Sequence, residues 1–158
     1  MTDLGAKLSS PVEVRNAARI GSWSGPTCGL APGFAQANLV LLPAAQSSAF
    51  RAFCASNPQA CPLLEEGEVG ALGLPEICAF GCDVRTDIPR YRVWRDGVAT
   101  EELTSLVDTP AWLEGQPWVA FALGCSFSFE EALREGGVEV RHNTLVPQFL
   151  AGHFADRW

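Results

Sequence analysis

The chain has 158 residues, of which 47% are hydrophobic and 18% are charged, and its formal net charge at pH 7 is −7. This length and composition fit one globular domain, residues 1–158, with a substantial core, and they argue against disorder. The acidic balance argues against nucleic acid and anionic membranes as partners, because both bind basic faces.

No run of about 18 apolar residues predicts a membrane span. The amino-terminal residues MTDLGAKLSS lack the apolar stretch of a secretory signal, so we expect a cytoplasmic protein. The six cysteines should therefore be reduced thiols. Cys78 and Cys82 form the one closely spaced pair, and without a second pair or a histidine set we expect no zinc site.

The first predicted element is a helix that begins after Ser10. Ser10 fits the N-cap, Pro11 the first helical position and Glu13 the capping-box position, and Gly21 ends the helix. The glycine- and proline-rich segment 21–33 should be a loop with defined turns. Residues 35–43 are expected to form a buried strand, and residues 44–56 a helix that ends at Asn57-Pro58.

The second half of the chain predicts more strands. After a short strand at 61–65 and a loop at 66–81, strands at 91–95 and 98–103 should form a hairpin about Asp96-Gly97. A buried strand at 118–123 leads to a short helix that Ser128 caps and Gly136-Gly137 ends. This alternation favours an α/β fold, a mixed β-sheet with flanking helices, with an inserted subdomain at about 80–118.

Four arginines fall between Arg85 and Arg95. On a strand, Arg90 and Arg92 share one face, and arginine binds carboxylates with a rigid two-pronged fork. Asp87, just before them, would supply an acid or base beside a bound anion. The alternative is a solvated edge strand whose arginines pair with nearby acidic residues, and the spacing alone favours this alternative.

The segment from Gly124 to Glu131 carries a second candidate site. A buried strand runs into a helix amino terminus, where free backbone N–H groups and the helix dipole suit a carboxylate or an oxyanion. Ser126 and Ser128 add hydroxyl donors, and Cys125 is a weaker candidate nucleophile. The alternative is a plain capped helix.

A third candidate is the early loop around Thr27, which leads to Gln36 and Asn38. It matches no phosphate-binding motif. The two amides need partners, which either a ligand or the backbone could supply, and neither reading is favoured. His142 is a candidate general base, against the alternative of an exposed histidine near the chain end.

Three segments, GPTCGLAPGFAQANLVLLP, RTDIPRYRVWRDG and GCSFSFEEAL with the VRH that follows, resemble the putative hydro-lyase family, which includes D-glutamate cyclase. The resemblance runs from about residue 11 to 142 and covers the front portion of the longer family members. It implies an α/β fold with two interlocked subdomains and chemistry that eliminates water. In the cyclase, D-glutamate loses water to give 5-oxo-D-proline.

Combined with residue types, the resemblance predicts a lyase that acts on a small amino or hydroxy carboxylic acid, with a non-catalytic carboxylate-binding module as the alternative. No cofactor is implied, a divalent metal ion is left open, and an exposed core face predicts a homodimer. The catalytic candidates are Asp87, Tyr91, Cys125, Glu130 and His142. The substrate-binding candidates are Thr27, Gln36, Asn38, Arg85, Arg90, Arg92, Ser126 and Ser128.

Overall fold

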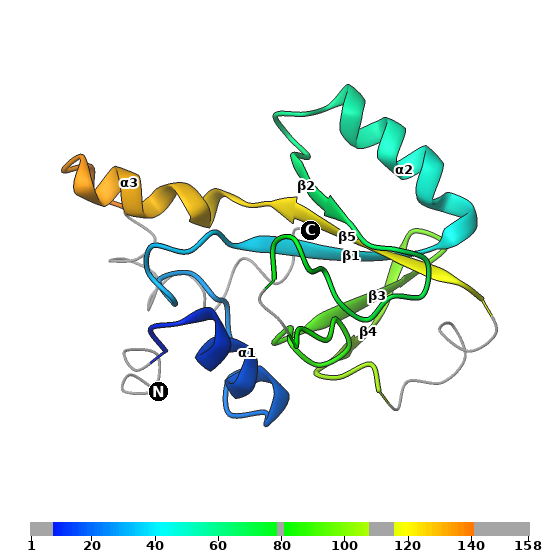
Figure 1. The fold of residues 1–158 in the computed structure, drawn as a ribbon, viewed down its shortest axis with the longest axis horizontal. Coiled ribbons are helices and arrows are strands. Elements are labelled where there is room, and N and C mark those ends of the chain that lie inside the picture. The colour runs from blue at the N-terminus through cyan, green and yellow to red at the C-terminus, as the bar shows by residue number, and fades with distance from the viewer. Residues whose placement is uncertain (1–7, 79–80, 108–115, 141–158) are drawn as a thin grey trace.

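The computed structural model describes residues 8–78, 81–107 and 116–140. Its helices are α1 (Pro11–Arg19), α2 (Ala44–Ser56), the 3-10 helix η2 (Ser126–Phe129) and α3 (Glu130–Glu135). Its strands are β1 (Ala37–Pro43), β2 (Leu63–Glu66), β3 (Tyr91–Arg95), β4 (Val98–Leu103) and β5 (Trp118–Gly124). The expected α/β class is confirmed, with both helices and sheets in the described residues (Figure 1).

The larger sheet has three strands in the order β1-β5-β2, and β3 pairs with β4 in a separate two-stranded sheet. Within the described residues, every strand pair is antiparallel. The two-stranded sheet falls inside the expected insertion at 80–118, which stays a prediction. Figure 1 shows α2 along one side of the larger sheet and α1 on the other.

The core centres on β5, whose residues Trp118 to Ala122 are all buried. Phe121 is fully buried, and the ring of Phe50 on α2 meets it edge to face at a centroid distance of 5.0 Å. β1 was expected to be a buried strand, but residues 39–43 are only half-buried. The reason is its place at the edge of the three-stranded sheet, which leaves one side without a neighbouring strand.

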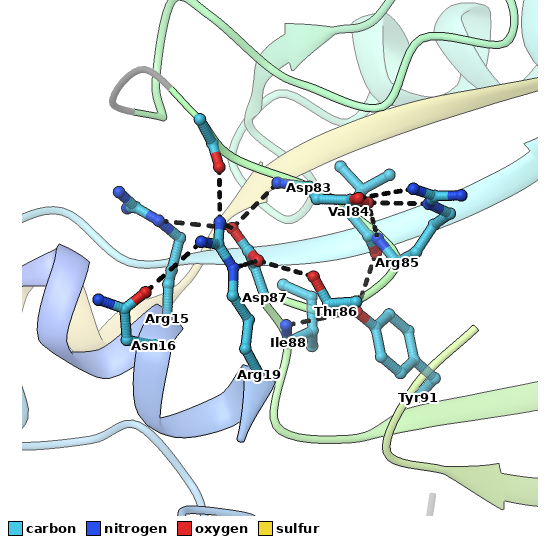
Figure 2. A network of polar contacts seen from close by, with 11 residues as sticks. Arg15, Asn16, Arg19, Asp83, Val84, Arg85, Thr86, Asp87, Ile88 and Tyr91 are labelled. Atoms are coloured by element: carbon cyan, nitrogen blue, oxygen red, sulfur yellow. Dashed lines mark hydrogen bonds and ion pairs between the residues drawn. The ribbon is translucent and has the colours of Figure 1, made fainter. Parts of the chain in front are cut away.

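Helix α1 forms as its sequence predicts. The Ser10 hydroxyl accepts a hydrogen bond from the Glu13 amide at 3.3 Å, and the Glu13 carboxylate accepts one from the Ser10 amide at 2.9 Å. The helix buries Val14, Ala17 and Ala18. With this face packed, the side chains of Arg15 and Arg19 on α1 point toward the loop that precedes β3 (Figure 2).

The β3–β4 hairpin is also confirmed. Asp96 and Gly97 have φ angles of 49° and 79°, the positive values that a type I′ turn requires. Along β3, Tyr91 and Val93 are buried while Arg92 and Trp94 are exposed, so the predicted alternation of faces holds.

Tyr91 fixes the loop in front of β3. Its hydroxyl donates to the Val84 carbonyl at 2.9 Å and accepts from the Ile88 amide at 3.3 Å. Burial raises the pKa of this hydroxyl well above its ordinary value, so it stays a neutral donor at physiological pH. Through these two hydrogen bonds, Tyr91 supports the loop of residues 84–88.

Replacing Tyr91 with phenylalanine should lower the free energy of unfolding by about 1–3 kcal/mol, because the Val84 carbonyl loses a buried donor. Urea unfolding followed by circular dichroism measures this change. An unfolding midpoint equal to that of the unmodified chain would show that the hydroxyl does not stabilise the loop.

Candidate functional site

A network of hydrogen bonds and ion pairs surrounds the buried carboxylate of Asp87, whose side chain is only 1% exposed. Arg19 donates to both carboxylate oxygens, through Nε to Oδ1 at 2.5 Å and through Nη2 to Oδ2 at 2.8 Å. The Thr86 hydroxyl and the Asp83 amide each donate at 3.0 Å. Figure 2 shows these donors converging on Asp87 from α1 and from its own loop.

A second arginine, Arg15, approaches the same carboxylate. Its Nε lies 3.5 Å from Asp87 Oδ2, and its side chain is 13% exposed, against 34% for Arg19. The hydrogen bond to Asp87 raises the pKa of Arg19, so this guanidinium stays charged. Four donors occupy the Asp87 oxygens, and this fixed carboxylate lies close enough to Arg15 to orient its guanidinium.

Two members of this network, Arg15 and Asp87, border a cavity of about 480 Å³, which lies between α1, the loop before β1, the turn at 74–78 and the 82–88 loop. A volume of this order suits a small ligand. Apolar side chains such as Leu30, Leu74 and Ala122 form part of its wall. Its polar lining consists of Arg15, Thr27, Gln36, Asn38, Cys78, Cys82 and Asp87.

The Gln36 side chain is held by its own loop. Its Oε1 accepts from the Thr27 hydroxyl at 2.8 Å, and its Nε2 donates to the Leu30 carbonyl at 3.2 Å. Protein groups therefore satisfy the Gln36 amide, as the alternative to a ligand contact predicts, and Thr27 is one of these groups. Asn38 lines the cavity with an exposed side chain and remains a candidate ligand contact.

The turn at 124–131 packs against this loop. The Ser128 hydroxyl accepts from the Gln36 amide at 2.9 Å and donates to the Gln36 carbonyl at 3.0 Å. The Cys125 thiol donates to the same carbonyl at 3.5 Å. The prediction that Ser128 caps a helix is wrong, because η2 occupies 126–129 and α3 begins at Glu130.

Two further residues of this turn were candidates. Ser126 is exposed, whereas Glu130 is buried. Burial raises the pKa of the Cys28 thiol, and the charge of Glu130 raises it further, so Glu130 lies close to the early loop. The 124–131 turn thus meets the Thr27–Asn38 segment, and Ser128 and Cys125 act there as supports.

The arginines from 85 to 92 lie at the surface and contact nearby protein groups, as in the alternative of a solvated edge strand. Arg85 pairs with Asp83 at 2.8 Å, and Arg92 pairs with Glu102 at 2.6 Å. Arg90 donates to the Ser24 carbonyl at 2.8 Å. Arg90 and Arg92 border another hollow, of about 740 Å³, together with residues 39–43 of β1.

The two segments that the sequence singled out, 85–95 and 124–131, do not form one pocket. Gly124 pairs with Ala37 at one end of β1, whereas Arg90 and Arg92 lie beside the other part of that strand. Figure 1 shows α3 and the β3–β4 hairpin extending toward different ends of the molecule. Instead, Asp87 alone of the first segment's candidates joins the cavity that Gln36 and Asn38 line. His142 lies outside the described residues.

Sequence reasoning missed Arg15 and Arg19, and it considered the pair Cys78 and Cys82 only as zinc ligands. The spacing of Arg15 and Arg19, four positions apart on a well-capped helix, places both on one face and was the available signal. In the described part of the chain, no group of three histidine, cysteine or acidic side chains is arranged to hold a metal ion. None of the described helices is long and apolar enough to span a bilayer.

Several known proteins are similar in sequence to this chain. The family model described as D-glutamate cyclase matches residues 119–151, which include β5, η2 and α3. A putative hydro-lyase of Rhizobium johnstonii is 47% identical over 135 residues, covering 85% of this chain and 48% of the relative. Most of this chain is therefore similar in sequence to about half of a putative hydro-lyase.

Other hydro-lyase relatives give the same picture. A putative hydro-lyase of Bordetella pertussis is 50% identical over 133 residues, or 82% of this chain and 45% of the relative. One from Clostridium beijerinckii is 48% identical over 143 residues, or 89% of this chain and 53% of the relative. The chain spans about half the length of these curated relatives.

Proposed function

We propose that this hydro-lyase relative eliminates water from a small amino or hydroxy carboxylic acid, and that Arg15 binds the substrate carboxylate in the cavity of about 480 Å³. The observation that supports this proposal is the position of Arg15. Its side chain is mostly buried, it faces the cavity, and within the described residues its ion pair with Asp87 is long, at 3.5 Å. A guanidinium in this setting is suited to a bidentate carboxylate.

The surrounding residues support the same assignment. Asp87, fixed by Arg19, orients Arg15 and offsets its charge while the cavity is empty of anion. Asn38 offers an amide to a second polar group of the ligand. The apolar residues of the wall lower the local dielectric, which strengthens a charged contact beside them. By contrast, Arg90 and Arg92 lie in exposed contacts, which makes them weaker carboxylate ligands.

A direct assay tests this proposal. Purified chain is incubated with D-glutamate and related amino and hydroxy acids, with and without a divalent metal ion, and proton NMR follows the products. We expect a product that has lost one molecule of water, such as 5-oxo-D-proline from D-glutamate.

The same assay separates a second candidate function, a non-catalytic carboxylate-binding module, for which the cavity beside Arg15 would be sufficient. Saturable binding of an acid without any water-loss product would select the binding module. A chain that neither binds nor converts any acid in the set would contradict the proposed function.

A further inference from the structure

Two thiols face the cavity that holds Arg15. Cys78 and Cys82 both line it, both are half-buried, and both are free cysteines. They are four positions apart in the chain, and each affects the pKa of the other. The proposed carboxylate site therefore contains a pair of ionisable groups beside a fixed cation.

Hydrogen bonds to Leu74 and Glu65 fix the turn that carries Cys78. The Cys78 amide donates to the Leu74 carbonyl at 2.8 Å. The buried carboxylate of Glu65 on β2 accepts from the Ile77 amide at 2.9 Å and from the Glu76 amide at 3.2 Å. These two hydrogen bonds connect Glu65 on β2 to the turn that carries Cys78, and they fix the position of that turn beside the cavity.

The charges around Cys78 come from three directions. The neighbouring Cys82 lowers the pKa of the Cys78 thiol most, burial raises this pKa, and Arg15 on α1 lowers it further. Glu65 on β2 and Asp87 in the following loop act in the opposite sense. The pKa of Cys78 falls to about 7, while that of Cys82 is raised, first by the neighbouring Cys78 and then by burial.

Resting on the proposed function, we propose that Cys78 is the proton-transferring residue of the Arg15 cavity and that Cys82 positions it. Thiolates carry out acid–base chemistry best when their ionisation lies near the working pH. Among the polar groups of the cavity, Asp87 already accepts hydrogen bonds from four donors. Cys78 is the group there that can both take up and release a proton near neutrality.

For D-glutamate the steps balance without a further reactant. The Cys78 thiolate removes a proton from the ammonium group, and the nitrogen lone pair forms a C–N bond to the distal carboxyl carbon. One C–O bond of that carboxyl breaks, and the departing oxygen receives the proton held by Cys78 and, by a second transfer, another from the nitrogen. The products are a lactam and water, and Cys78 ends as a thiolate.

The first test measures the thiolate itself. The full chain is alkylated with iodoacetamide across pH 5 to 10, and mass spectrometry of peptides gives the rate at each cysteine. We expect half-maximal reactivity of Cys78 near pH 7 and a higher midpoint for Cys28, whose pKa burial raises. Replacing Cys82 with alanine should move the Cys78 midpoint upward. A Cys78 midpoint at or above that of Cys28 would overturn the proposal.

The second test measures proton transfer. Cys78→Ser should reduce turnover of the acid that the unmodified chain accepts by about a hundredfold or more, the usual range for loss of an acid–base group. In the unmodified chain, kcat should rise with pH through about 7, as the Cys78 thiolate forms, and this limb should vanish in Cys78→Ser. Cys61→Ser, a half-buried cysteine outside the cavity, is the matched control and should keep full activity.

Retention of full turnover by Cys78→Ser would overturn this inference while leaving the proposed function in place. Absence of turnover by the unmodified chain would instead count against the proposed function. In that case the alkylation profile alone decides the inference, and an ordinary midpoint for Cys78, near the unperturbed thiol value of about 8.5, would refute it.

Discussion

Replacing Arg15 with glutamine is expected to lower kcat/KM for the accepted acid by about a hundredfold. Removing one partner of a desolvated charge pair typically costs about 2–5 kcal/mol of binding, and about 1.4 kcal/mol corresponds to a factor of ten. Arg15 is only 13% exposed and lines the cavity, so water does not replace its contact with the carboxylate. Initial rates of water loss, followed by NMR over a range of acid concentrations, measure the change.

Two control variants make this result specific. Arg51→Gln removes the same charge from an exposed ion pair with Glu66 and should leave turnover unchanged. Arg15→Lys keeps the charge but loses the planar fork, so its activity should lie between that of Arg15→Gln and that of Arg51→Gln. If Arg15→Gln keeps wild-type kcat/KM, the carboxylate is bound elsewhere.

The same assay compares two locations for the carboxylate clamp. The arginine cluster in the sequence predicts that Arg90→Ala and Arg92→Ala abolish turnover, whereas the cavity predicts the loss of about a hundredfold in Arg15→Gln. Arg92 already pairs with Glu102 at 2.6 Å, and both side chains are substantially exposed. Full loss of activity in Arg92→Ala together with full activity in Arg15→Gln would return the site to the β3 strand.

Asp87→Ala should be the most destabilising substitution at the site, lowering the free energy of unfolding by about 3 kcal/mol. The variant leaves Arg15 without its carboxylate in a mostly buried position, and Arg19 loses two hydrogen bonds. Arg19 is one-third exposed and partly regains contact with water, which keeps the expected loss at the lower end of the range for buried pairs.

Urea unfolding followed by circular dichroism measures this loss, with Glu102→Ala as the matched control. Glu102 is about half exposed and pairs with Arg92, so its removal should cost less than about 1 kcal/mol. Equal unfolding midpoints for the two variants would contradict the view that the Asp87 network fixes α1 to the loop before β3.

Local signals in the sequence predicted most elements. The capping box at Ser10, the helix over 44–56 and the Asp96-Gly97 hairpin all depend on residues within a few positions of one another. The prediction for Ser128 failed because its hydroxyl is satisfied by Gln36, which is 92 positions away in the chain. No local pattern reports such a partner.

The candidate site was predictable only in part, for the same reason. Gln36, Asn38 and Asp87 were singled out and do border one cavity. Arg19 binds Asp87 across 68 positions, so only the packing of α1 against the later loop creates this network. The arginine cluster was the stronger signal in the sequence, but exposed acidic partners on β4 neutralise it.

The most direct test of the account is NMR of the arginine side chains while D-glutamate or a related acid is added. The Nε–H signal of Arg15 should shift and saturate, since its guanidinium faces the cavity, whereas that of Arg92 should stay in place. A saturable shift at Arg92 or Arg90, with Arg15 unchanged, would contradict the assignment of the carboxylate site.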